Sequence, residues 1–97
     1  MTQRKENTHK MREIRNKIDN IDNKILPLMI KRSHLVNNAL HLKTKKSEIV
    51  DLKRINQIKR KITSKSKKLG GDPKLMTNIW MSIIKNFIKF ERKNFKK

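Results

Sequence analysis

The fold is decided by residues 11–43, which read MREIRNKIDNIDNKILPLMIKRSHLVNNALHLK. Apolar residues recur there at alternating steps of three and four, the spacing of one face of an α-helix. We call these residues the apolar seam: Met11, Ile14, Ile18, Ile21, Ile25, Leu28, Leu35, Ala39 and Leu42. The seam predicts one long amphipathic helix that starts near residues 9–11.

Arg32 lies between Leu28 and Leu35, at a position where the seam requires an apolar side chain. An arginine on a buried stripe is costly unless an anion meets it. No aspartate or glutamate lies between Asn23 and Ser47. The nearby sequence therefore provides no partner, and Arg32 indicates a bound anionic ligand.

Pro27 lies inside the predicted long helix. A proline there removes one backbone hydrogen bond and costs about 3 kcal/mol or bends the helix. The seam continues in phase on both sides of Pro27, which predicts a kinked but continuous helix; the alternative is a break near Leu26. A helix of this length spans about 50 Å, more than a small domain needs, so we expect the chain to form an oligomer.

Two shorter helices are expected after the long one. Ser47 can cap the second, with Glu48 in its first turn. The residues expected to face inward from it are Ile49, Leu52, Ile55, Ile58 and Ile62. Gly70-Gly71 should end that helix, and Asp72-Pro73 should begin the third.

The third helix is predicted to carry a wide apolar face. Its members are Leu75, Met76, Ile79, Trp80, Ile83, Ile84, Phe87 and Ile88. No strand pattern occurs in the sequence, so the expected fold class is all-α. The expected organisation is a flexible N-terminus at residues 1–8, a helical domain at 9–92 and a basic tail at 93–97.

The net charge is +19, from 27 lysines and arginines against 8 acids. Such a charge can indicate a nucleic-acid partner. The basic residues are spread over the whole chain, however, and the aromatic residues all lie near the C-terminus, which disfavours platforms for base stacking. The sequence therefore favours a basic composition without a dedicated function, and nucleic acid is not expected as a partner.

Other classes of site are also disfavoured. The chain has no cysteine, and His34 and His41 have no carboxylate or cysteine companions for a metal. The longest apolar run, at residues 25–30, contains a proline and is too short to span a membrane. We expect a cytoplasmic protein without a metal or cofactor.

Three basic residues of the long helix could hold an anion. Arg32 and Lys43 are eleven residues apart, which is three turns plus about 20°, so they share one side. Arg15 precedes Arg32 by 17 residues, which places it about 26 Å along the axis and about 100° around it. The two arginines of one chain therefore cannot grip one small molecule. If two long helices pair antiparallel, Arg15 of one can approach Arg32 of the other.

Further polar residues share faces with the predicted core. Asp51 and Arg54 lie three apart on the second helix, and Glu91 continues an apolar stripe of the third. Together with the basic residues they form a cationic pocket with an acid at its edge, which suits a small ligand with more than one carboxylate. The simpler alternative is that Arg15 and Lys43 extend into water and that Asp51 and Arg54 form a surface pair.

Three parts of this pattern resemble the all-helical chorismate mutases. RNKIDNID at residues 15–22, ILPLMIKR at 25–32 and the following Lys43 are similar to the first helix of that family. Asp51 and Arg54 are similar to its second-helix Asp-x-x-Arg, and WMSIIK at 80–85 resembles its third helix. The similarity extends over about residues 11–92.

The resemblance implies an intertwined homodimeric helical bundle without a cofactor. Members convert chorismate to prephenate, towards phenylalanine and tyrosine. An isochorismate pyruvate-lyase of the same fold is the nearest alternative function, and a basic helical nucleic-acid-binding protein is the alternative from another class.

The resemblance also implies roles for the basic residues of the long helix. Arg32, together with Arg15 from the partner chain, would hold the substrate carboxylates. Lys43 would hydrogen-bond a carboxylate and the ether oxygen. Arg15 would thus be contributed across the dimer interface.

The remaining site residues follow from the second and third helices. Arg54 would add positive charge near the ring, Asp51 would hold the ring hydroxyl, and Glu91 would face the ether oxygen. Two positions depart from the family pattern. Ile55 stands where a glutamate usually binds the ring hydroxyl, and Phe87 stands where a small residue is usual.

Overall fold

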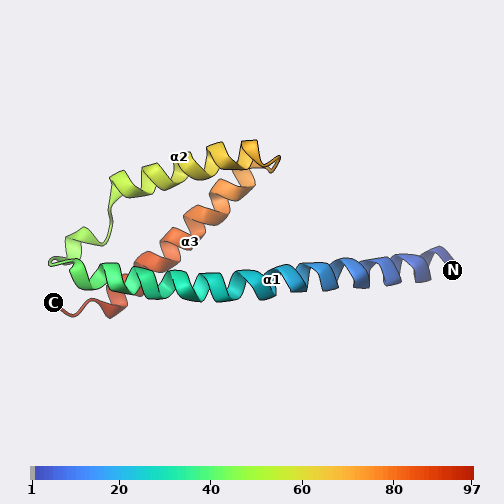
Figure 1. Cartoon of the computed structure of the whole chain (residues 1–97), viewed down its shortest axis with the longest axis horizontal. Helices are drawn as coiled ribbons and strands as arrows, with labels where there is room; N and C mark the ends of the chain where they lie inside the picture. Colours follow the sequence, from blue (N-terminus) through green and yellow to red (C-terminus); the bar gives the residue numbers. More distant parts are fainter. Residues whose placement is uncertain (1) are drawn as a thin grey trace. The chain divides into compact units, whose positions relative to one another are not determined.

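The computed structural model describes residues 2–97 and is built from helices (Figure 1). The elements in chain order are α1 (Thr2–Leu42), the short 3₁₀ turn η1 (Lys46–Glu48), α2 (Leu52–Lys68) and α3 (Pro73–Asn94). No strand occurs in this described part of the chain. The all-α class, with one long and two shorter helices, is therefore confirmed. The chain divides into an N-terminal unit, residues 1–34, and a C-terminal unit, residues 35–97.

Helix α1 is continuous through Pro27, so a break near Leu26 is wrong. The predicted start near residues 9–11 is also wrong, because the helix begins at Thr2. The first turns lack apolar periodicity and so give no sequence signal. A helix nevertheless propagates with one hydrogen bond per added residue once it is nucleated. The flexibility expected of residues 1–8 stays a prediction, and Met1 lies outside the described residues.

The N-terminal unit leaves its apolar face uncovered. Six residues of the seam are each between 45% and 67% exposed: Met11, Ile14, Ile18, Ile21, Ile25 and Leu28. A contiguous apolar stripe of this kind on a soluble surface marks an interaction site. The N-terminal unit by itself therefore does not bury the residues that specify its helix.

Helices α2 and α3 pack against each other as a hairpin (Figure 1). The turn between them is set by Gly70, which has a φ of +76°, the left-handed region that glycine adopts without strain. The Gly71 N–H donates to the Ser66 carbonyl at 2.8 Å, closing the end of α2. Asp72 then caps α3 by accepting from the backbone N–H of Lys74 and of Leu75. Both predicted boundaries at this turn are confirmed.

The predicted start of α2 is wrong. Ser47 and Glu48 form the 3₁₀ turn η1, and α2 begins after Asp51, whose Oδ1 accepts from the Arg54 N–H at 3.0 Å. Serine and aspartate are both favoured caps, so composition alone does not choose between them. Ile49 consequently lies in the connection, where it is 4% exposed, rather than on the helix.

The C-terminal unit has a small core. Its most buried apolar residues are Leu40 of α1, Ile49 of the connection and Ile84 of α3. Leu52 was expected to face inward, but it is 69% exposed. It lies about 80° around α2 from the half-buried Ile62, which takes it off the packed face.

The expected basic tail is partly helical. Lys93 and Asn94 belong to α3, and the Phe95 N–H donates to the Glu91 carbonyl at 2.9 Å. The Lys97 ammonium donates to the carbonyl of His41, in the last turn of α1. The C-terminal end of α3 therefore lies beside the end of α1. None of the helices in residues 2–97 combines the length and apolar character that crossing a membrane requires, and the expected compartment stays a prediction.

Candidate active site

The C-terminal unit joins two of the predicted catalytic residues, Lys43 and Glu91. They are 48 residues apart in the chain, yet Lys43 Nζ donates to Glu91 Oε2 at 2.7 Å. The lysine side chain is 22% exposed and the glutamate side chain 11% exposed. A short ion pair that is largely shielded from water keeps both groups in fixed positions.

Backbone contacts on both sides place this pair. Lys43 directly follows α1, and its N–H donates to the carbonyl of the buried Leu40 at 3.1 Å. Glu91 lies in the last turn of α3, where its carbonyl accepts from Phe95. The ion pair is therefore held where the ends of two helices meet.

A shallow depression of about 510 Å³ opens on one side of Lys43. It is lined by Lys43, Glu48, Val50, Asp51 and Leu52. Two predicted site residues, Lys43 and Asp51, thus line the same depression. The sequence reasoning missed Glu48, because it assigned that residue to the first turn of a helix.

Glu48 and Thr44 are both exposed and are joined by a hydrogen bond. The Thr44 hydroxyl donates to Glu48 Oε1 at 2.9 Å. This hydrogen bond is the main reason that the pKa of Glu48 is lowered, since it favours the ionised carboxylate. Glu48 therefore presents a carboxylate that accepts hydrogen bonds and cannot donate them. The sequence signal that could have pointed to Glu48 is the presence of an acid five residues after Lys43.

The spacing of Asp51 and Arg54 has a structural explanation. The side chain of an N-cap residue accepts a hydrogen bond from the backbone N–H three positions later in the chain. Asp51 accepts this bond from the Arg54 N–H. The Arg54 side chain is exposed. The capping bond uses Oδ1 of Asp51, and the second carboxylate oxygen is not part of it. A substrate-binding role for Asp51 and for Arg54 stays a prediction.

Arg15 and Arg32 belong to the N-terminal unit. Arg15 is exposed and lines an open depression along α1 together with Met11 and Asn16. Arg32 is half-buried. Their predicted contacts with substrate carboxylates stay predictions.

The two departures from the expected pattern lie on α2 and α3. Ile55 and Phe87 are both half-buried. The Phe87 ring meets the Phe90 ring edge to face, with centroids 6.2 Å apart. An apolar side chain therefore occupies the turn of α3 that precedes Glu91.

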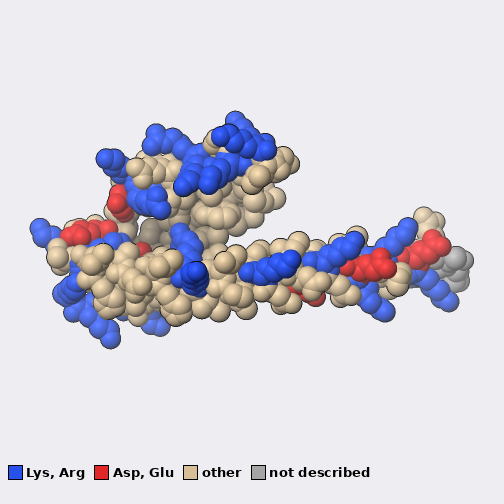
Figure 2. Space-filling model, viewed as in Figure 1, with Lys and Arg blue, Asp and Glu red and all other residues tan. Residues whose placement is uncertain are grey.

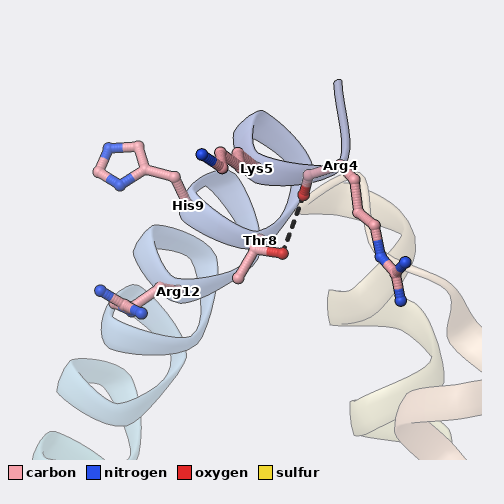
Figure 3. Close-up of a pocket in the computed structure, with 5 residues that line it drawn as sticks. All are labelled: Arg4, Lys5, Thr8, His9 and Arg12. Atoms are coloured by element: carbon pink, nitrogen blue, oxygen red, sulfur yellow. Dashed lines mark hydrogen bonds between the residues drawn. The ribbon is translucent and has the colours of Figure 1, made fainter. Parts of the chain in front are cut away.

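A further depression, of about 480 Å³, lies at the start of α1 (Figure 3). It is lined by Arg4, Lys5, Thr8, His9 and Arg12. In Figure 3 these side chains spread outward from a single helix, and Arg4 points away from His9 and Arg12. Groups that diverge from one exposed helix do not make a preorganised site, so this depression is not the candidate active site.

The charge of the C-terminal unit favours an anionic ligand. Helix α2 carries eight lysines and arginines and no acid. Figure 2 shows basic side chains over much of α2. A basic surface raises the local concentration of anions and speeds their capture.

Comparison with known proteins identifies the family of the chain. The family model described as Chorismate mutase type II matches residues 14–92, which is most of the chain. No curated protein and no solved structure matches it. The matched range includes all six predicted site residues and ends one residue after Glu91. The chain therefore belongs to the type II chorismate mutase family, whose members are intramolecular isomerases that act on chorismate.

Proposed function

We propose that the chain is a monofunctional chorismate mutase that works as a homodimer without a cofactor and converts chorismate to prephenate for phenylalanine and tyrosine synthesis. The observation that carries this proposal is the ion pair of Lys43 with Glu91, 2.7 Å long and largely shielded from water. It supplies a fixed hydrogen-bond donor and a neighbouring acid in a basic helical unit.

The reaction suits these residue types. Chorismate rearranges within itself: its ether C–O bond breaks while a new C–C bond forms, so neither a nucleophile nor a general base is needed. The enzyme must hold the dianion in its reactive conformation, which is an orientation effect. It must also stabilise the negative charge that grows on the ether oxygen, using donors already in place.

Lys43 is the proposed donor to the ether oxygen. An ammonium group carries three N–H donors, and the bond to Glu91 uses one of them. The other two can reach the ether oxygen and a substrate carboxylate. A carboxylate would repel the charge that grows on the ether oxygen, so the proposed part of Glu91 is to fix the direction of the Lys43 side chain through Oε2.

The proposed substrate contacts include four further residues. Arg32 and the partner subunit's Arg15 hold the two carboxylates, and Arg54 adds positive charge near the ring. Asp51 accepts the ring hydroxyl through the carboxylate oxygen that is not used in capping α2. These assignments rest on membership of the family and on the residues that match its pattern.

The proposed dimer forms through the seam of α1. The exposed seam residues of the N-terminal unit are the support for this step, since each has about half of its surface left to bury. Removing apolar surface from water contributes about 25 cal/mol per Å². A second copy of α1 presents the same stripe, and antiparallel pairing of the two brings the partner's Arg15 towards Arg32.

The proposed function is tested by turnover of chorismate. We expect the wild-type chain to consume chorismate and to form prephenate. Arg32→Ala should lower kcat/KM at least a hundred-fold, because an arginine that holds a carboxylate contributes roughly 3 kcal/mol to binding the transition state. Arg4→Ala is the matched control, since Arg4 lies outside the family match. Full activity of Arg32→Ala contradicts the proposed site, and formation of salicylate from isochorismate without prephenate indicates the lyase instead.

A further inference from the structure

Helix α2 carries basic residues in pairs along one side. The pairs recur every seven residues, which corresponds to two turns less about 20° and a rise of about 10.5 Å along the axis. They therefore stack into two rows that run along the helix. We call this side the basic face: the pairs Lys53-Arg54, Arg60-Lys61 and Lys67-Lys68, together with Lys65.

The opposite side of α2 packs against α3. Ile55 and Ile62 are half-buried on that side, and Ser66 is buried. The Thr63 and Thr77 hydroxyls meet at 2.8 Å between the two helices. The centre of the packed side lies about 160° around α2 from the centre of the basic face. The hairpin therefore turns the basic face outward, and each residue of that face is exposed.

No acid and no apolar residue interrupts the basic face. Residues 52–71 contain no aspartate or glutamate. The side chains between the two rows are those of Gln57 and Ser64, which are exposed and can donate hydrogen bonds. Among residues 2–97, no ion pair involves the basic face. Its positive charge is therefore not balanced by acids of the chain.

This composition distinguishes between kinds of partner. A helix that binds a lipid surface inserts apolar side chains, but the apolar side of α2 is packed on α3. A protein interface has a core that is depleted of charge, which the basic face lacks. Single strands are held by aromatic side chains that stack on bases, and α2 has none. Phosphates need only charged and polar donors, and these can contact a duplex without reading its sequence.

We propose that the basic face of α2 binds the phosphate backbone of double-stranded nucleic acid without sequence preference. The sequence alone disfavoured a nucleic-acid partner, because the basic residues are spread over the whole chain. Helical geometry, however, gathers seven of the eight in α2 on one exposed side (Figure 2). The proposed mutase function is not needed for this inference, and Arg54 is the residue that the two proposals share.

The test is the binding of a fluorescently labelled DNA duplex of about 20 base pairs, followed by anisotropy between about 50 and 200 mM KCl. The variant carries Arg60→Gln, Lys61→Gln, Lys67→Gln and Lys68→Gln together, since glutamine removes the charge and favours a helix. Each lost phosphate contact makes the slope of log K against log salt shallower by about 0.9. We therefore expect a slope shallower by about three to four and a loss of affinity of about a hundred-fold or more.

The matched control also changes one arginine and three lysines to glutamine, all of them exposed on α1: Arg4, Lys5, Lys10 and Lys17. Both sets remove four charges, and circular dichroism shows that the helices are retained. The control should keep the wild-type slope and an affinity within about three-fold, because salt screens charges that lie far from the bound duplex.

An equal loss in both variants overturns the proposal, because it assigns binding to the net charge of the whole chain. Binding to vesicles of phosphatidylserine that is tighter than binding to the duplex also overturns it, in favour of a lipid surface. Chorismate turnover is measured on the same samples. A wild-type chain that binds the duplex through α2 but does not turn over chorismate overturns the proposed function and supports the basic face.

Discussion

Breaking the Lys43–Glu91 ion pair is expected to lower the free energy of unfolding by about 2 kcal/mol. Removing one partner of a fully buried pair costs about 3–5 kcal/mol, whereas an exposed pair contributes about 0–1 kcal/mol. With side chains 22% and 11% exposed, this pair lies between those limits. For a chain of 97 residues, a change of that size lowers Tm by about 10 °C.

A double-mutant cycle isolates the pair itself. Lys43→Met keeps the aliphatic stem and Glu91→Gln keeps the side-chain volume, so each variant removes charge with little change in packing. Urea unfolding, followed by circular dichroism at one fixed protein concentration, gives the four free energies. The expected coupling energy is about 1–2 kcal/mol.

The chain offers a matched control in His9 and Glu13. Their atoms are 3.0 Å apart, but the side chains are 70% and 59% exposed, and the pair is ionic only when His9 is protonated. We expect a coupling energy below about 0.5 kcal/mol for this exposed i,i+4 pair. A coupling for Lys43 and Glu91 no larger than that of the control would refute the view that shielding from water fixes the two groups.

Two further predictions concern the dimer and the capping residue. Ile21→Asp puts a charge on a seam residue that is 56% exposed in the single chain. We expect this variant to sediment as a monomer and to lose mutase activity. An active dimer would contradict the proposed interface. Asp51→Ala should lower the free energy of unfolding by about 1 kcal/mol through loss of the cap, whereas Asp51→Asn keeps the cap but not the charge. If Asp51 holds the ring hydroxyl, Asp51→Asn raises the KM for chorismate at nearly unchanged stability; an unchanged KM assigns Asp51 to capping alone.

The features of the fold that local sequence signals carry were predictable. The in-phase seam on both sides of Pro27 predicted a continuous α1, and the structure has one. Gly70 and Asp72 predicted the turn between α2 and α3, because a left-handed residue and a cap each need a particular residue type. Such signals depend on neighbours in the chain and are therefore readable from sequence.

The boundaries that failed depend on competition between similar signals. Ser47 and Asp51 are both good caps four residues apart, and packing of the intervening Ile49 into the core decides for Asp51. The early start of α1 at Thr2 has no apolar pattern to announce it. Helix propagation alone accounts for that segment.

The candidate site was predictable only where helical spacing places a residue. Glu91 was placed on an apolar stripe by helical spacing, but its contact with Lys43 depends on how the end of α3 packs beside the end of α1. Glu48 was expected in the first turn of a helix and not beside Lys43, because the 3₁₀ turn and the hydrogen bond from Thr44 have no periodic signature. Contacts made by connections need the three-dimensional structure.

The most direct measurement is the rate of chorismate consumption with prephenate as product, made on the wild-type chain and on Lys43→Ala. The proposed mechanism requires Lys43 to stabilise the ether oxygen, and removing such a donor costs about a hundred-fold to a thousand-fold in kcat. We therefore expect prephenate from the wild type and a loss of that size in Lys43→Ala, with Lys5→Ala unchanged as the control. Prephenate formation by Lys43→Ala at the wild-type rate would contradict the central claim.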